Sequence, residues 1–247
     1  MNYGSGSFAG DKKDIHSDIK AAANSEKAAI LARFFKTGPG EYGEGDKFHG
    51  IVVPQCRQIA KTHVATMSID AIIGLLHSDW HEERQIALFM LTHKFSDGDE
   101  SQKRNIFEIF LKNTNYINNW DLVDINSPTI VGQYIYEHPR LLPLLDKLAS
   151  SKLVWDRRIA VISTFYFIAK GDPGPTLNIV KKLLNDDHDL IQKASGWMLR
   201  EVGKRIDNEL LIQFLKKHYT NMPRTTLRYA IEKFSPQDRS RFLSGKF

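Results

Sequence analysis

Apolar residues recur every three or four positions along most of the chain, which is the spacing of one face of an α-helix. Residues 78–94, 154–169 and 191–202 show this pattern most clearly. Ser78 or Asp79 is a candidate N-cap for the first of these helices, and two glutamates follow in its first turn. No segment alternates strictly between apolar and polar residues. The pattern therefore predicts an all-α protein.

A glycine-rich stretch interrupts the helical pattern in the first quarter of the chain. Residues 37–50 contain five glycines, so we expect a long loop there. Residues 49–53 form a candidate short extended piece that Pro54 would end. Residues 1–12 match no helical pattern and are expected to be a flexible N-terminal segment. Residues 13–247 are then expected to form a single domain.

A faint repeat of 35 residues runs through the second half of the sequence. Arg158, Lys193 and Arg228 follow this spacing, and a small residue stands two positions after each of them. Trp120 and Trp155 are also 35 residues apart. Such spacing is typical of stacked helix pairs of the HEAT type, in which a small residue allows close helix contact. We predict a HEAT-like α-solenoid of stacked antiparallel helix pairs with a concave basic groove; an irregular helical bundle is the alternative.

The composition is that of a globular protein. Hydrophobic residues make up 42% and charged residues 26% of the 247 residues. The first ten residues contain no apolar core of a signal peptide, and no apolar run reaches the roughly 20 residues that cross a bilayer. Cys56 is the single cysteine and stands close to Pro54 in an apolar stretch. We expect it to be buried and structural, and we expect a cytoplasmic protein without disulfides.

The net charge of +5 is concentrated near the C-terminus. Residues 190–247 contain 12 Lys and Arg against 5 Asp and Glu, or +7, so the remainder carries 5 − 7 = −2. A basic C-terminal quarter indicates an anionic partner, of which nucleic acid is the commonest. The alternative is a solvated basic helix surface.

Several familiar catalytic patterns are absent. Residues 38–47 lack the Gly-Lys-Ser/Thr ending of a phosphate-binding loop, and their acidic side chains would repel phosphate. His81 has no second histidine four residues later, so residues 81–84 are not a zinc-protease helix. One cysteine cannot supply the cysteine pair of a zinc deaminase. The sequence therefore contains none of these three motifs.

Three segments on candidate inner helices carry the remaining chemistry: 118–135, 155–160 and 191–201. Within the first, Trp120 and Asp124 are four residues apart and share one helix face. An aromatic face beside a carboxylate can stabilise a cation. If the inner helices are neighbours, Trp120, Asp124, Arg158 and Trp197 converge in one groove.

These segments resemble the AlkD-type DNA alkylation-repair glycosylases, a family with a HEAT-like fold, over roughly residues 28–234. The resemblance is strongest in Trp120-Asp-Leu-Val-Asp124, in Trp-Asp-Arg-Arg158-Ile-Ala and in Gln-Lys-Ala-Ser-Gly-Trp197-Met-Leu-Arg-Glu. It implies that Asp124 is the catalytic carboxylate. It also implies that Trp120 and Trp197 are the groove tryptophans and that Arg158 contacts phosphate.

The resemblance further implies hydrolysis of the N-glycosidic bond of cationic alkylpurines, such as 3-methyladenine and 7-methylguanine, in double-stranded DNA. It implies no metal, no cofactor and no Schiff-base lysine, and by analogy a monomer. A cationic base departs neutral, so no general acid is required, and one carboxylate suffices where a sugar hydrolase normally needs two.

Ordinary structural roles remain open for the same residues. Trp120 and Trp197 are also suited to the core, Asp124 to a helix cap or the surface, and Arg158 to packing between repeats. Asp121 lies three residues before Asp124 and could be mistaken for the catalytic carboxylate. We expect it to have a structural role, pairing with Arg157 or Arg158. Trp155 is expected to pack between repeats.

A wider DNA-binding track is expected from basic residues that follow Arg158, some of which can instead pair with Glu201 or Glu232. The candidates are Lys193, Arg200, Lys204, Arg205, Arg224 and Arg228. Two other functions remain open: a non-catalytic HEAT-like binder of DNA structures and a protein-binding repeat scaffold.

Overall fold

The computed structural model describes residues 14–246, which fall into two compact units that divide between Met90 and Leu91. Both units are helical, and apart from one isolated bridge the described residues contain no β-structure. This confirms the all-α prediction. The expected N-terminal segment, residues 1–12, lies outside the described residues, and a single domain over 13–247 stays a prediction. Within the described range, no helix is long and apolar enough to cross a membrane.

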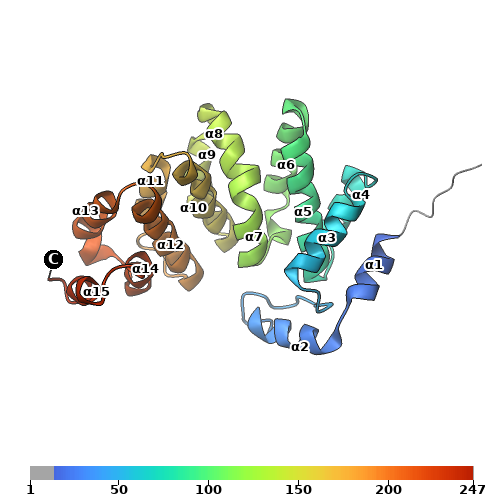
Figure 1. Ribbon diagram of the computed structural model, residues 1–247, viewed down its shortest axis with the longest axis horizontal. Helices are drawn as coiled ribbons and strands as arrows, with labels where there is room; N and C mark the ends of the chain where they lie inside the picture. Colours follow the sequence, from blue (N-terminus) through green and yellow to red (C-terminus); the bar gives the residue numbers. More distant parts are fainter. Residues whose placement is uncertain (1–13, 247) are drawn as a thin grey trace, which may run out of the picture. The chain divides into compact units, whose positions relative to one another are not determined.

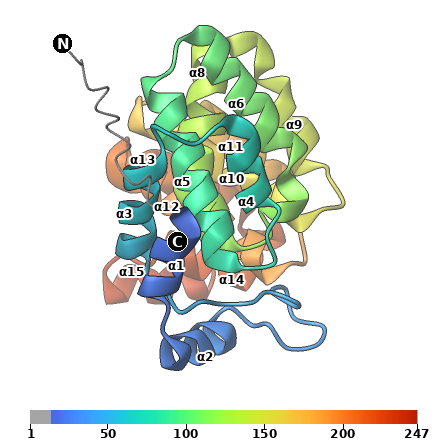
Figure 2. The same ribbon diagram turned by 90° about the vertical axis from the view of Figure 1, so that its right-hand side faces the viewer.

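The first unit contains four complete helices and the beginning of a fifth. They are α1 (Ile15–Ala22), α2 (Ser25–Phe34), α3 (Val53–His63), α4 (Ile69–Leu76) and the first part of α5 (His81–Asp97). The predicted glycine-rich loop connects α2 to α3 (Figure 2). Pro54 lies in the first turn of α3, where proline is tolerated, and so it does not end an extended strand at 49–53. Cys56 is fully buried in α3, as predicted.

Helix α5 begins at His81, three residues later than the sequence pattern predicts. The cause is a pairing with the distant loop. The backbone N–H of Lys47 donates to the carbonyl of Asp79 at 3.1 Å, and that of His81 donates to the carbonyl of Lys47 at 2.8 Å. These bonds form an isolated bridge between Lys47 and Trp80, which keeps residues 78–80 out of the helix.

The second unit contains the end of α5 and ten further α-helices. They are α6 (Glu100–Lys112), α7 (Trp120–Ser127), α8 (Tyr134–Glu137), α9 (Pro143–Ala149), α10 (Val154–Ala169), α11 (Gly174–Lys182), α12 (Asp189–Arg205), α13 (Asn208–His218), α14 (Arg224–Ala230) and α15 (Pro236–Leu243). Helix α10 packs against α7 and α12, and α12 packs against α14 (Figure 1). Helices α9, α11 and α13 lie between them in sequence and contact the same row. This is the predicted HEAT-like arrangement.

The 35-residue spacing in the sequence corresponds to one helix pair. Arg158, Lys193 and Arg228 lie on α10, α12 and α14 respectively. The small residues that follow them, Ala160 and Ser195 among them, are buried where these helices pack. Trp155, at the start of α10, is buried as expected for a repeat-packing residue. The repeat therefore predicted the helix pairing correctly.

Helix α7 continues into α8 through a widened turn. Residues Pro128–Gln133 form a π-helix between the two. Proline has no backbone N–H, so Pro128 cannot donate to the carbonyl of Asp124, its normal helical acceptor. At the other end, the side chain of Asn119 accepts the backbone N–H of Trp120 at 2.8 Å and fixes the start of α7. Both features lie within one turn of the predicted site residues.

Two glycines allow the helices of this row to approach closely. A Cβ on Gly132 would lie 2.3 Å from the carbonyl oxygen of Ser163 on α10. A Cβ on Gly196 would lie 2.4 Å from the carbonyl oxygen of Thr226 on α14. In both cases backbone atoms would have to move. Glycine at these positions is therefore a packing requirement between adjacent repeats.

Replacing Gly132 by Ala should lower the free energy of unfolding by about 1–3 kcal/mol, because the added methyl group overpacks the contact with Ser163. The measurement is urea-induced unfolding followed by circular dichroism. Gly74→Ala is the control, since Gly74 is an exposed position of α4 where an added Cβ meets nothing within 4 Å. That change should stabilise by up to about 1 kcal/mol. Equal effects of the two substitutions would contradict the packing argument.

Candidate functional site

Asp124 and Arg158 form a two-point ion pair between helices α7 and α10. Nε of Arg158 donates to Oδ1 of Asp124 at 2.8 Å, and Nη2 donates to Oδ2 at 2.7 Å. The Asp124 side chain is 12% exposed and that of Arg158 is 6% exposed. Planar guanidinium and carboxylate groups match in this geometry, which fixes the orientation of both. The structure thus brings two of the predicted site residues into direct contact.

The third guanidinium nitrogen of Arg158 reaches another helix. Its Nη1 donates to the backbone carbonyl of Leu190, in the first turn of α12. One side chain therefore connects α7, α10 and α12. These bonds use three of the five N–H donors of the arginine, which leaves two for a further acceptor. The predicted phosphate contact of Arg158 would have to be made with these two or by releasing a bond.

The electrostatic environment of Asp124 is set by opposing effects. Burial raises the pKa of the Asp124 carboxyl above its ordinary value, because removal from water disfavours the charged form. The charge and hydrogen bonds of Arg158 oppose this rise, and the nearby Asp121 carboxylate adds to it. The net pKa is raised. A perturbed carboxyl beside a specific charge partner is a feature of many functional sites.

Trp120 occupies the first position of α7, one helical turn before Asp124. Trp120 is half-buried. The buried Asn119 accepts the backbone N–H of Trp120 and so fixes the position of Trp120 at the start of the helix. The adjacent aromatic and carboxylate groups expected from the sequence are therefore present on one helix.

Trp197 lies near the middle of α12 and is also half-buried. Its indole N–H donates to Oε1 of Glu201 at 3.3 Å, one turn further along the helix. Its ring lies 6.4 Å from that of Phe165 on α10, measured between centroids. Trp197 was predicted from the sequence, whereas the contact with Phe165 and the role of Glu201 as hydrogen-bond acceptor were not. Of these two contacts, only the one with Glu201 could have been predicted, because residues four apart share one face of a helix.

Four of the six residues of the predicted basic track have a hydrogen-bond or ion-pair partner within the protein. Arg200 pairs with Glu232, which follows the end of α14, and Nε of Arg205 lies 2.7 Å from Oε2 of Glu201. Lys193 pairs with Asp189 at 2.6 Å, and Arg224 donates to the carbonyl of Leu243 at 2.7 Å. Lys204 and Arg228 are exposed. The expected competition from Glu201 and Glu232 is confirmed, whereas phosphate contact by these residues stays a prediction.

Asp121 is buried on α7. The two arginines expected to pair with it bind other carboxylates. Arg157 binds Asp186, with 2.6 Å between Nε and Oδ2, and Arg158 binds Asp124. Asp121 acts on the site through its charge, which adds to the raised pKa of Asp124.

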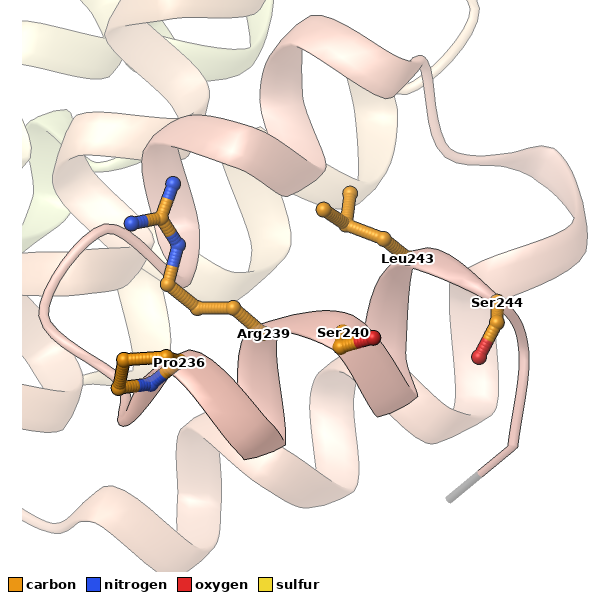
Figure 3. Close-up of a pocket in the computed structure, with 5 residues that line it drawn as sticks. All are labelled: Pro236, Arg239, Ser240, Leu243 and Ser244. Carbon is orange, nitrogen blue, oxygen red and sulfur yellow. The ribbon is translucent and has the colours of Figure 1, made fainter.

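A shallow pocket of about 460 Å³ lies along α15, away from these residues in sequence. Arg239 and Leu243, one turn apart, project from the same side of the helix into it (Figure 3). None of its five lining residues belongs to the predicted site. It therefore does not bear on the chemistry of Asp124.

Comparison with known proteins identifies the family of this chain. The family of DNA alkylation repair enzymes matches residues 15–234. The chain belongs to this family. A solved structure described as a predicted DNA alkylation repair enzyme from Enterococcus faecalis is similar, with a TM-score of 0.68, 17% sequence identity, and coverage of 87% of this chain and 97% of that chain. At this identity the likeness shows a shared fold. No curated protein sequence matches the chain.

Replacing Arg158 by Leu should lower the free energy of unfolding by about 3–5 kcal/mol at neutral pH, because the Asp124 carboxylate is left buried without its counter-charge. Protonation removes that charge, so the loss should shrink as the pH falls. Denaturant unfolding at several pH values measures both effects.

Arg228→Leu is the matched control, since Arg228 holds the equivalent repeat position but is exposed. Its substitution should change stability by no more than about 0.5 kcal/mol. A loss that is the same for both variants, or that does not vary with pH, would contradict a buried ion pair at Arg158.

Proposed function

We propose that this protein is a monofunctional DNA glycosylase that hydrolyses the N-glycosidic bond of cationic alkylated purines, such as 3-methyladenine and 7-methylguanine, in duplex DNA. The observation that carries the proposal is the Asp124 carboxylate, buried and held at two points by Arg158, one turn from the half-buried Trp120. Membership of the DNA alkylation repair enzyme family supports a damaged DNA substrate. Such an activity would begin base excision repair.

The proposed reaction needs stabilisation of a positive sugar. An alkylated purine carries a positive charge and departs as a neutral base, so the electron pair of the glycosidic bond leaves with it. The deoxyribose then develops oxocarbenium character. The negative charge of Asp124 stabilises this cation and orients or deprotonates the attacking water. The faces of Trp120 and Trp197 are suited to hold the sugar and to attract its charge.

Arg158 has a role in this proposal that follows from its contacts. By gripping both carboxylate oxygens it fixes the direction in which Asp124 presents its charge. A carboxylate has about four acceptor sites, and Arg158 uses one on each oxygen, so a water can still bind. The two remaining N–H donors of Arg158 allow a DNA phosphate to bind as well. The exposed Lys204 and Arg228 would add salt-dependent affinity for the backbone.

A non-catalytic binder of DNA structures is the second candidate. The observation that favours it is the same ion pair, because a carboxylate engaged on both oxygens is less available to a substrate than a free one. Both candidates predict binding to duplex DNA that weakens with salt. Release of a base separates them.

The protein should release 7-methylguanine and 3-methyladenine from methylated duplex DNA, and Asp124→Asn should abolish release. Asn is nearly isosteric but carries no charge, so it cannot stabilise the sugar cation. Free bases are measured by chromatography, and binding to unmodified duplex is measured in parallel and should persist. Undiminished release by Asp124→Asn would refute the proposed role of Asp124. No release by either protein, with binding intact, would support the non-catalytic binder.

The rate of base release should fall on the acid side at a pH above about 3.9, the ordinary pKa of aspartate. Activity requires ionised Asp124, and its raised pKa means that protonation begins at a higher pH. Single-turnover rates across acidic pH, corrected for spontaneous base loss, test this. Circular dichroism at each pH confirms that the protein stays folded. A rate that is constant down to pH about 3.9 would contradict the environment described for Asp124.

A further inference from the structure

Glu201 is a buried carboxylate with a role that the proposed reaction scheme does not yet contain. It lies on α12, one turn after Trp197, and its side chain is 8% exposed. Oε1 accepts the indole N–H of Trp197 at 3.3 Å, and Oε2 lies 2.7 Å from Nε of Arg205. Burying a carboxylate is costly unless it is paired and hydrogen-bonded. Oε1 also lies 3.8 Å from Nε of Arg200, so the carboxylate serves three partners, of which Trp197 and Arg205 hold different oxygens.

The contacts of these side chains close into a ring, which we call the Trp197 clamp: Trp197, Glu201 and Arg205 on α12, and Phe165 on α10. The guanidinium carbon of Arg205 lies 4.9 Å from the centre of the Phe165 ring. Phe165 in turn lies 6.4 Å from the Trp197 ring, measured between ring centroids. Each member of the clamp therefore contacts the next, and two helices contribute to it.

The clamp restricts both ways in which an indole can move. A tryptophan side chain rotates about two torsion angles, and the second of these has a broad range of allowed values. The hydrogen bond from the indole N–H to Glu201 fixes the direction of the ring edge, and Phe165 limits displacement toward α10. The residue that precedes Trp197, Gly196, packs closely against α14, and this contact holds the backbone in place. An ordered ring loses less entropy when a ligand binds against it.

We propose that Glu201 is a positioning residue for Trp197, which sets the orientation of the indole and holds Arg205 beside it. This inference rests on the proposed function only for its effect on rate; the orientation itself is a property of the free protein. A misplaced sugar-holding ring slows the chemical step, and errors of about 1 Å can cost up to about a hundredfold in rate. Glu201 does not itself touch the substrate in this scheme.

The orientation is tested first without substrate. The sequence has four tryptophans, so a nitrogen–proton NMR spectrum contains four indole N–H signals, and the one lost in Trp197→Phe is that of Trp197. Glu201→Ala should shift this signal and speed its exchange with water, whereas Glu201→Gln keeps an acceptor oxygen and should restore most of the difference. The exposed Glu209 on α13 supplies the control Glu209→Gln, which should leave the signal unchanged. An unaltered signal in Glu201→Ala would overturn the proposal.

The effect on catalysis is tested with a double-mutant cycle under saturating protein, so that altered DNA affinity does not enter. Glu201→Ala should lower the single-turnover rate of 7-methylguanine release by about tenfold to a hundredfold. In a Trp197→Phe background, which lacks the indole N–H, the same change should cost less than about twofold. Equal losses in both backgrounds would show general destabilisation and overturn the positioning role.

These two measurements separate failure of this inference from failure of the proposed function. If the unmodified protein releases no base, the glycosylase proposal fails, while the NMR comparison still decides whether Glu201 orients Trp197. If base is released and the Trp197 indole signal is the same in Glu201→Ala as in the unmodified protein, the glycosylase proposal stands and the clamp is refuted.

Discussion

The ion pair of Arg158 with Asp124 is the interaction on which both the packing of the second unit and its proposed chemistry depend. Removing a carboxylate from water costs several kcal/mol, and that cost is tolerable only if a counter-charge with good geometry replaces the lost water. Arg158 supplies that counter-charge and donates hydrogen bonds to both oxygens of Asp124. Its third nitrogen donates to the backbone carbonyl of Leu190. The same side chain therefore joins three consecutive inner helices and determines where a negative charge is held. A site with this construction cannot be altered without also altering the contact between repeats.

The repeat explains how such a site arises from an otherwise uniform scaffold. Arg158, Lys193 and Arg228 occupy equivalent positions on α10, α12 and α14, yet their surroundings differ. Arg158 is buried against a carboxylate from the preceding inner helix, α7, Lys193 pairs with Asp189 on its own helix, and Arg228 is exposed. A stacked architecture presents the same position several times, and the neighbouring helix determines its role. The carboxylate at Asp124, rather than the basic residue, is what distinguishes the site.

The features that could be predicted from sequence are those encoded by residues near one another in the chain. The helix over 154–169 agrees with α10 at both ends, and the 35-residue spacing identified the row α10, α12 and α14. The start of α5 was predicted wrongly because its position depends on Lys47, more than thirty residues away. The ion pair of Arg158 with Asp124 was not predicted for a similar reason, since Asp124 lies 34 residues before Arg158 on another helix. The family resemblance predicted both Asp124 and Arg158 as site residues, but it did not predict the contact between them.

A preformed ion pair is compatible with catalysis because neither partner is saturated. Arg158 occupies about two of the four acceptor sites on Asp124, and Asp124 with Leu190 occupies three of the five donors on Arg158. In the proposed reaction, the remaining acceptor sites of the carboxylate would bind a water or the sugar cation, and the remaining donors of the guanidinium would bind a phosphate. Catalytic electrostatics are most effective when charged groups need not reorganise during the reaction. The packing of α7, α10 and α12 orients Asp124 when the protein folds. Little further free energy is then needed to orient it when DNA binds.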